Sequence, residues 1–295
     1  MDEHVLYEKD PVTHIARVTL NRPEKMNAMT VQMYERIIEV MDDAAEDDAV
    51  KVVILRGAGG CFTTGVDMGE VYGWYESPSG SGNGSGNGER KRRPSQRRRL
   101  VVDRRTNAVY TRVFFHPKVT VAQVERYALG GGFEFLMGCD ISVVGESAKV
   151  GMPATRYLGP VLGDLHLFFH RLGPVLAKDL LLTGRTPPAS ELAHLGVFTR
   201  CVPDDEVAAC AEEMAALVAR MPADGIVVAK ESYRLVEASM GMALSEVSSY
   251  LLHAYGTNLQ FEDDEFNFVR TRATTGGLSE SFDEAERFYD GESTG

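Results

Sequence analysis

Three successive glycines, Gly130 to Gly132, stand between a predicted strand over residues 119–124 and a short apolar segment with the character of a helix. Glycine lets the backbone approach a ligand closely, and amide hydrogens at a helix amino terminus carry partial positive charge, so such a turn can hold an oxyanion. A tight turn without a ligand also produces this pattern. Glu134 places a carboxylate in the first turn of the helix, where it either interacts with the helix dipole or faces a cleft as a functional group.

A second glycine-containing turn, CFTTGVDM over residues 61–68, follows a predicted strand over residues 51–55. Two turns that each follow a strand could donate one amide hydrogen apiece to the same oxygen, which is the arrangement that acyl chemistry requires. The spacing along the chain does not establish that the two turns meet. The sequence therefore offers an oxyanion site as a hypothesis that depends on the fold.

Strand and helix patterns alternate in the first half of the chain. Residues 14–20 and 51–55 have the composition of strands, and residues 30–47 place apolar side chains at helical spacing after a capping Thr30. This order predicts an α/β fold. Beyond residue 159 the pattern predicts helices over residues 165–172, 174–182, 208–221, 225–238, 244–255 and 278–289. We expect a core over residues 1–200 and a helical region over residues 201–295.

The composition is that of an ordinary globular protein. The 295 residues are 44% hydrophobic and 25% charged, and no apolar run reaches the roughly 18 to 20 residues that a membrane helix needs. The amino-terminal residues are acidic, unlike a signal peptide, so a cytoplasmic protein is expected. The four cysteines have neither the spacing of a zinc site nor that of a disulfide framework, and we expect them to be reduced and buried.

One segment opposes the overall charge of −12. Residues 90–105 hold nine basic side chains and one acidic side chain, and residues 77–88 contain only serine, glycine, asparagine and one proline. Such a composition cannot bury enough apolar surface to offset its ordering entropy. Residues 77 to about 99 are therefore predicted to form a flexible basic excursion.

The chain carries, in this order, the motifs Leu20-Asn21-Arg22-Pro23 with Asn27-Ala28, CFTTGVDM, YALGGGFE with GCDI, and Leu182-Thr183-Gly184 followed by Leu195-Gly196-Val197. Over residues 12–240 these motifs resemble the crotonase superfamily, the enoyl-CoA hydratase/isomerase family. The resemblance implies a spiral core of ββα units, a helical carboxy-terminal trimerisation region, and a homotrimer or homohexamer. It also implies a CoA thioester as substrate, with no separate cofactor and no metal.

The same resemblance assigns site residues by position. The amides of Val66 and Gly131 would hold the thioester oxygen and so stabilise an enolate, a contribution of about 3 to 4 kcal/mol for each donor in such sites. The loop around Lys25 and Met26 would lie near the pantetheine or phosphates of CoA. The remaining residues of the CoA-binding turn would be Asp67, Met68 and Gly69.

The acid and base groups depart from the family pattern. Hydratases of the family use two glutamates, and Glu134 matches the first, but Ala154 or Thr155 stands where the second is expected. Asp164 lies at the next turn, where the carbon–carbon bond hydrolases of the superfamily carry an aspartate. It could share acid and base roles with Glu134, or it could cap the helix that begins at Leu165. His166 is a further candidate base.

Three functions follow as alternatives. The preferred one is an enzyme of the enoyl-CoA hydratase/isomerase type that hydrates an enoyl-CoA or shifts its double bond. The second is a carbon–carbon bond hydrolase that uses Asp164. The third is a noncatalytic RNA-binding protein of the same fold, disfavoured because the basic arm lacks interleaved aromatic residues. The arginines of the arm could instead pair with the phosphates of CoA or form a solvated loop.

Overall fold

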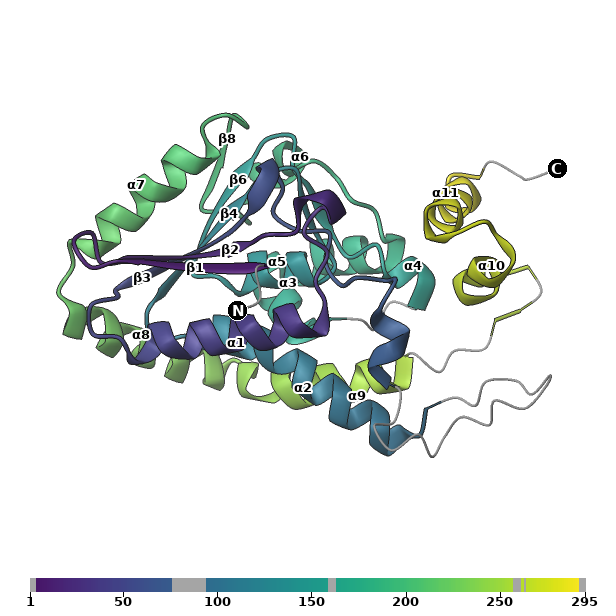
Figure 1. The fold of residues 1–295 in the computed structure, drawn as a ribbon, viewed down its shortest axis with the longest axis horizontal. Helices are drawn as coiled ribbons and strands as arrows, with labels where there is room; N and C mark the ends of the chain where they lie inside the picture. Colours follow the sequence, from purple (N-terminus) through teal and green to yellow (C-terminus); the bar gives the residue numbers. More distant parts are fainter. Residues whose placement is uncertain (1–3, 76–93, 159–162, 257–260, 263, 292–295) are drawn as a thin grey trace.

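A six-stranded sheet forms the centre of the computed structural model, which describes residues 4–75, 94–158, 163–256, 261–262 and 264–291 (Figure 1). The strand order is β1-β2-β3-β4-β6-β8; β1 is antiparallel to β2, and the other neighbours are parallel. A second sheet pairs β5 with β7 in parallel. The bounds are β1 Val5–Asp10, β2 Ile15–Leu20, β3 Val52–Gly57, β4 Val119–Val124, β5 Tyr127–Leu129, β6 Ile141–Gly145, β7 Lys149–Gly151 and β8 Arg200–Val202.

Helices connect and cover these strands. The α-helices are α1 Val31–Glu46, α2 Gln96–Phe114, α3 Gly131–Gly138, α4 Thr155–Leu158, α5 Leu165–Thr183, α6 Ala189–Ala193, α7 Val207–Ala219, α8 Ala223–Ser239, α9 Ser245–Gly256, α10 Phe268–Thr274 and α11 Leu278–Tyr289. Short 3-10 helices are η1 Pro23–Lys25, η2 Ala58–Gly60, η3 Val71–Tyr75 and η4 Met242–Leu244. Parallel strands need such crossover connections, which is why the predicted α/β fold is observed.

Both faces of the sheet are buried, because successive side chains of a strand point to opposite sides. On β3, Val53 and Leu55 join the main core with α1, α3 and α5, whereas Val52 and Ile54 join a second cluster. The second cluster is closed by one face of α7, which lies along the sheet (Figure 1). A strand buried on both faces has a continuous apolar sequence, and the VVIL of β3 is of this kind.

Most of the predicted elements are confirmed, with corrections at their limits. Helix α2 begins at Gln96 with Ser95 as its cap, so residues 96–99 of the predicted excursion are helical. Residues 77–93 of that excursion lie outside the described residues. The helices predicted over residues 165–172 and 174–182 form one element, α5, with a kink at Gly173, where φ is +70°. Strand β1 and helix α10 were not predicted. Cys201 and Cys210 are half-buried, not buried as expected.

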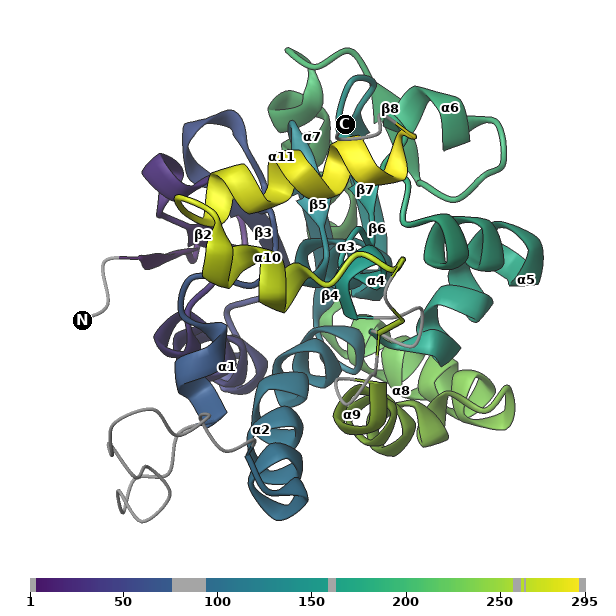
Figure 2. The ribbon, with the colours of Figure 1, turned by 90° about the vertical axis from the view of Figure 1, so that its right-hand side faces the viewer.

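The predicted division at residue 200 stays a prediction, and the structure adds two facts to it. Strand β8 spans residues 200–202, and α7, which lies beyond that division, packs on β2, β3, β4 and β6. Within the described ranges, no helix is long and apolar enough to span a membrane. The last two helices, α10 and α11, form a separate pair at one end of the fold (Figures 1 and 2).

A small aromatic cluster holds α10 and α11 to the rest of the chain. Phe268 of α10 is fully buried between Tyr157 of α4 and Phe282 of α11, with ring centroids 4.7 Å and 5.0 Å away. Met68, which belongs to the second glycine-containing turn, packs against the same cluster. The carboxy-terminal helices therefore rest on the turn that the sequence analysis assigned to CoA.

We expect Phe268→Ala to open α10 and α11 while the six-stranded sheet stays folded. Removing a buried phenylalanine side chain costs about 3–5 kcal/mol, and this cluster is separate from the main core. Peptide-resolved hydrogen exchange should show faster exchange in residues 264–291 and unchanged protection of β4. Phe288→Ala is the matched control because Phe288 is 47% exposed. Unchanged protection of α10 and α11 in Phe268→Ala would contradict the prediction.

Candidate active site

The structure brings the two glycine-containing turns together. A parallel bridge joins Thr63 to Ala128, with the Thr63 amide donating to the carbonyl of Tyr127 at 2.9 Å and the Leu129 amide donating to the carbonyl of Thr63 at 3.2 Å. At Gly65, where φ is +89°, a Cβ would lie 2.6 Å from the Leu129 carbonyl oxygen and 3.0 Å from the Gly131 nitrogen. Only glycine permits this approach.

The amides of Val66 and Gly131 take no part in the hydrogen bonds that fix the two turns. Residues on either side of Val66 make the bridge to Met29: the Met29 amide donates to the Gly65 carbonyl at 2.7 Å, and the Asp67 amide donates to the Met29 carbonyl at 2.9 Å. Gly131 is the first residue of α3, where helix amides have no intrahelical acceptor. Within the described part of the chain, neither amide donates to another protein atom.

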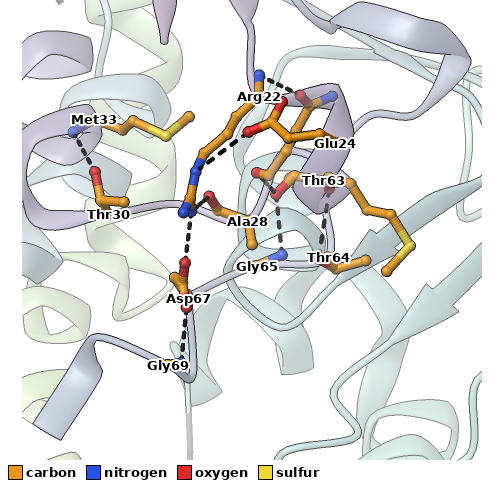
Figure 3. Close-up of polar contacts among 12 residues, drawn as sticks. Arg22, Glu24, Ala28, Thr30, Met33, Thr63, Thr64, Gly65, Asp67 and Gly69 are labelled. Carbon is orange, nitrogen blue, oxygen red and sulfur yellow. Dashed lines mark hydrogen bonds and ion pairs between the residues drawn. The ribbon is translucent and has the colours of Figure 1, made fainter. Parts of the chain in front are cut away.

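Arg22 and Asp67 brace the second turn (Figure 3). The Arg22 guanidinium donates from Nη1 to Asp67 Oδ2 at 2.6 Å and to the Ala28 carbonyl at 3.0 Å, and Asp67 Oδ1 accepts from the Gly69 amide at 2.7 Å. Burial acts to raise the pKa of Asp67, but these hydrogen bonds outweigh it, so the pKa lies below its usual value. The carboxylate predicted to line the CoA-binding turn therefore holds the turn in shape.

Asn27 ties its own loop to the loop that follows β3, and it was part of the motif that carried the family resemblance. It is fully buried; its Nδ2 donates to the carbonyls of Ala58 and Cys61, and its Oδ1 accepts from the Arg22 amide at 2.8 Å. Its neighbours Lys25 and Met26 are exposed beside it, so the structure places the predicted CoA-contacting loop at the surface. Their contact with CoA stays a prediction.

Arg272 of α10 is a contact to this turn that the sequence analysis missed. Its Nη1 donates to the carbonyl of Met68 at 2.7 Å, and its Nη2 lies 3.5 Å from the carbonyl of Gly69. The turn is therefore held from the amino-terminal side by Arg22 and from the carboxy-terminal side by Arg272. More than 200 residues separate the two arginines, so no local pattern could have paired them.

Glu134 lies in the first turn of α3, and its side chain is buried. Its Oε1 accepts a hydrogen bond from the Asp164 amide at 3.0 Å. Burial, and then the charge of Asp164, raise the pKa of Glu134 to about 8, while hydrogen bonds from the Asp164 amide and Tyr110 act in the opposite direction. A carboxyl with a pKa in this range can both accept and return a proton near neutral pH.

Asp164 performs the capping role that the sequence analysis left as one of two options. Its Oδ1 accepts from the Leu167 amide at 3.0 Å, as an N-cap of α5 does, and also accepts from the Ser245 hydroxyl of α9. Its charge also acts on Glu134. Capping is therefore confirmed, and an additional acid–base role stays a prediction.

The positions that would carry the second glutamate hold no replacement acid. Thr155 is buried, and its hydroxyl donates to the Met152 carbonyl at 3.0 Å, while Ala154 is half-buried. His166, the other candidate base, places Nδ1 3.0 Å from the Ser248 hydroxyl. Among the residues with described placement, no three histidine, cysteine or carboxylate side chains gather as metal ligands do.

Described arginines of the basic segment contact protein groups. Arg98 donates to the Trp74 carbonyl at 3.2 Å, the Arg99 guanidinium lies 5.6 Å from the centre of the Tyr75 ring, and Arg105 pairs with Glu35 of α1. Residues 90–93 lie outside the described residues. Pairing of the arm with CoA phosphates or with RNA therefore stays a prediction.

Comparison with known proteins agrees with this geometry. Residues 12–275 match the family model described as enoyl-CoA hydratase/isomerase. The enoyl-CoA hydratase EchA19 of Mycobacterium tuberculosis is 33% identical over 203 residues, which are 68% of this chain and 70% of EchA19. The crystal structure of an enoyl-CoA hydratase/isomerase from Xanthobacter autotrophicus Py2 is similar with a TM-score of 0.75 and 26% identity, covering 97% of this chain and 98% of that one.

An enoyl-CoA hydratase from Mycobacterium smegmatis shares the fold with a TM-score of 0.80 at 24% identity, over 98% of this chain and 94% of that one. The fold and the two converging turns thus define a protein of the crotonase superfamily. Within that class, the chain belongs to the enoyl-CoA hydratase/isomerase family.

The raised pKa of Glu134 predicts a pH-dependent cost to stability. Between its usual pKa of 4.5 and about 8, the native state keeps a proton that the unfolded chain releases. This extra proton stabilises the native state in full below pH 4.5, and the stabilisation is lost as the pH rises through about 8. Glu134→Gln cannot ionise, so its free energy of unfolding should rise relative to the wild type between about pH 5 and pH 9, as measured by urea unfolding.

Glu39→Gln, at an exposed position of α1, serves as the control for that measurement. Its difference from the wild type should not follow the same pH dependence. A difference between Glu134→Gln and the wild type that stays constant over this range would contradict the prediction.

Proposed function

We propose that this chain is an acyl-CoA enzyme that moves a proton at the α-carbon of an enoyl thioester. The amides of Val66 and Gly131 would donate to the thioester oxygen and stabilise the enolate, and Glu134 would transfer the proton. The observation that carries this proposal is the approach of Gly65 to Gly131, with the buried carboxyl of Glu134 three residues further along α3. Membership of the enoyl-CoA hydratase/isomerase family supports a CoA thioester as substrate.

One carboxyl can serve both reactions named in the family description. In hydration, Glu134 would take a proton from water as the oxygen attacks the β-carbon, and Glu134 would then deliver that proton to the α-carbon. In isomerisation, Glu134 would remove the α-proton and return it at the γ-carbon. Charge accumulates on the thioester oxygen in both cases, so preorganised amide donors lower both barriers. The hydratase EchA19 favours hydration as the first activity to assay.

A second candidate, hydrolysis of a carbon–carbon bond, is favoured by the position of Asp164 beside Glu134. It would require the Asp164 carboxylate to activate water or to orient it. Since Oδ1 already accepts from the Leu167 amide and the Ser245 hydroxyl, only Oδ2 would serve. These contacts give the candidate less support than proton transfer by Glu134.

Glu134→Gln should lower kcat by about 10²–10⁴-fold, the usual contribution of a general acid or base, while the affinity for a CoA thioester is retained. Loss of the conjugated thioester absorbance of crotonyl-CoA reports hydration, and gain of that absorbance from a 3-enoyl-CoA reports isomerisation. Calorimetry with a non-reactive acyl-CoA measures affinity. Near-wild-type turnover in Glu134→Gln would remove Glu134 from this role.

Asp164→Asn is the matched variant, because asparagine also caps helices well. We expect it to keep activity within about tenfold of the wild type, since its capping hydrogen bond can be retained. A loss of several orders of magnitude, together with cleavage of a β-keto thioester by the wild type into one carboxylic acid and a shorter CoA thioester, would favour the hydrolase candidate.

We further propose that the chain forms a homotrimer or homohexamer through α8, η4 and α9. These elements expose large apolar side chains that a monomer would leave in water, among them Leu235 at 74%, Val228 at 65% and Leu244 at 65% exposed. Light scattering should give a mass three or six times that of the chain. Leu235→Glu should lower that mass, and Val12→Glu, at a position 85% exposed in the turn between β1 and β2, should leave it unchanged. A wild-type monomer would contradict the proposal.

A further inference from the structure

Two tyrosines that the sequence analysis did not select lie beside the glycine turn. A Cβ on Gly131 would lie 2.2 Å from the hydroxyl oxygen of Tyr110 and 3.0 Å from that of Tyr34. Both hydroxyls therefore occupy the space that a side chain at Gly131 would fill. Tyr34 comes from α1 and Tyr110 from α2, so two helices direct one phenol each to the amino terminus of α3.

The two hydroxyl groups form one unit. Their oxygens are 2.7 Å apart, so one hydroxyl donates to the other. Packing fixes the rings: Tyr110 lies 5.0 Å from Phe135, and Tyr34 meets both Tyr110 and Trp74 edge-on at 6.0 Å and 5.7 Å between centroids. Rings held on two sides have few rotamers, and the position of the Tyr110 hydroxyl is therefore well defined.

This pair faces the one carboxyl that the proposed reaction uses. Glu134 follows Gly131 by one turn of α3, and the Tyr110 phenol lies near enough to the Glu134 carboxyl to lower its pKa. On its other side, Glu134 accepts from the Asp164 amide through Oε1. The carboxyl therefore has a backbone donor before α5 and a phenol from α2 beside it.

We infer that Tyr110 is a positioning residue for the reaction, which, supported by Tyr34, holds the Glu134 carboxyl beside the Gly131 amide in the absence of a second glutamate. The inference rests on the proposed function. A carboxyl that must pick up a proton at one atom and release it at another needs a fixed orientation, and small displacements of reacting groups cost large factors in rate. The phenol supplies this orientation without adding a second negative charge.

The charge state of Tyr110 suits this task. Burial, followed by the charges of Tyr34 and Glu134, raises the pKa of Tyr110 well above its usual value, so its hydroxyl stays a donor over the working pH range. Burial and the charge of Asp164 raise the pKa of Glu134, whereas the Asp164 amide and Tyr110 lower it. On α5, His166 places Nδ1 3.0 Å from the Ser248 hydroxyl, and Arg171 donates to the Met137 and Cys139 carbonyls at the opposite end of α3.

Removing the Tyr110 hydroxyl should therefore change both rate and pH profile. In Tyr110→Phe we expect kcat for the enoyl-CoA that the wild type turns over to fall by about ten- to a hundredfold, with KM little changed. The substitution removes the phenol that lowers the pKa of Glu134, so the pH limb of kcat/KM that Glu134 controls should move to higher pH. Tyr34→Phe should produce the same shift to a smaller extent.

Tyr7→Phe is the matched control, because it also removes one buried phenol, on the edge strand β1. Its rate and pH profile should equal those of the wild type. Equal rates and equal profiles for Tyr110→Phe and Tyr7→Phe would overturn the inference. Should Tyr110→Phe fail to fold, as judged by circular dichroism, an unshifted profile in Tyr34→Phe would overturn it instead.

A measurement without turnover separates this inference from the proposed function. The free energy of unfolding of Glu134→Gln exceeds that of the wild type by an amount that rises with pH. When both proteins also carry Tyr110→Phe, this rise should continue to higher pH. If the wild type turns over no enoyl thioester, the proposed function fails whatever the tyrosines do. Suppose that the wild type is active and Glu134→Gln is not. If Tyr110→Phe then changes neither the pH dependence of the stability difference nor the pH profile of kcat/KM, only the inference fails.

Discussion

The close contact between Gly65 and the Gly130–Gly131 backbone is the constraint on which the rest of the site depends. A side chain at Gly65 would collide with the Leu129 carbonyl, and a side chain at Gly131 would collide with Tyr110. Because both positions lack a Cβ, two loops that follow separate strands of a parallel arrangement can place their amides together. Arg22, Asn27 and Arg272 then hold one loop in place through its backbone carbonyls and Asp67.

The second constraint is electrostatic. A carboxyl in the first turn of α3 is removed from water by apolar neighbours, and the cost of its ionisation appears as the raised pKa of Glu134. The fold offsets part of that cost with the Asp164 amide, which donates to the carboxyl, and with the Tyr110 phenol, which also lowers its pKa. The same arrangement that destabilises the charged native state near neutral pH gives a group able to exchange protons there.

Local patterns predicted much of the fold because the interactions that define those elements are local. The Thr30 cap, the spacing of apolar side chains in α1 and the apolar run of β3 are all read within a few residues. Strand β1 was missed because it is polar and half exposed at the edge of the sheet. Its pairing with β2, and not its own sequence pattern, makes this segment a strand. Helix α10 is seven residues long, and the burial of Phe268 against α4 supports it.

The sequence by itself determined the family, both glycine turns, Glu134 and the absence of a glutamate at residues 154 and 155, because each is a property of residue identity at a fixed spacing. Only the tertiary structure decided that Asp67 braces its own turn, that Asp164 caps α5, and that Tyr110, bonded to Tyr34, lies beside Glu134. Those facts join residues far apart in the chain. A hydrogen bond between such residues depends on distances set by packing of the whole core, which no local pattern encodes.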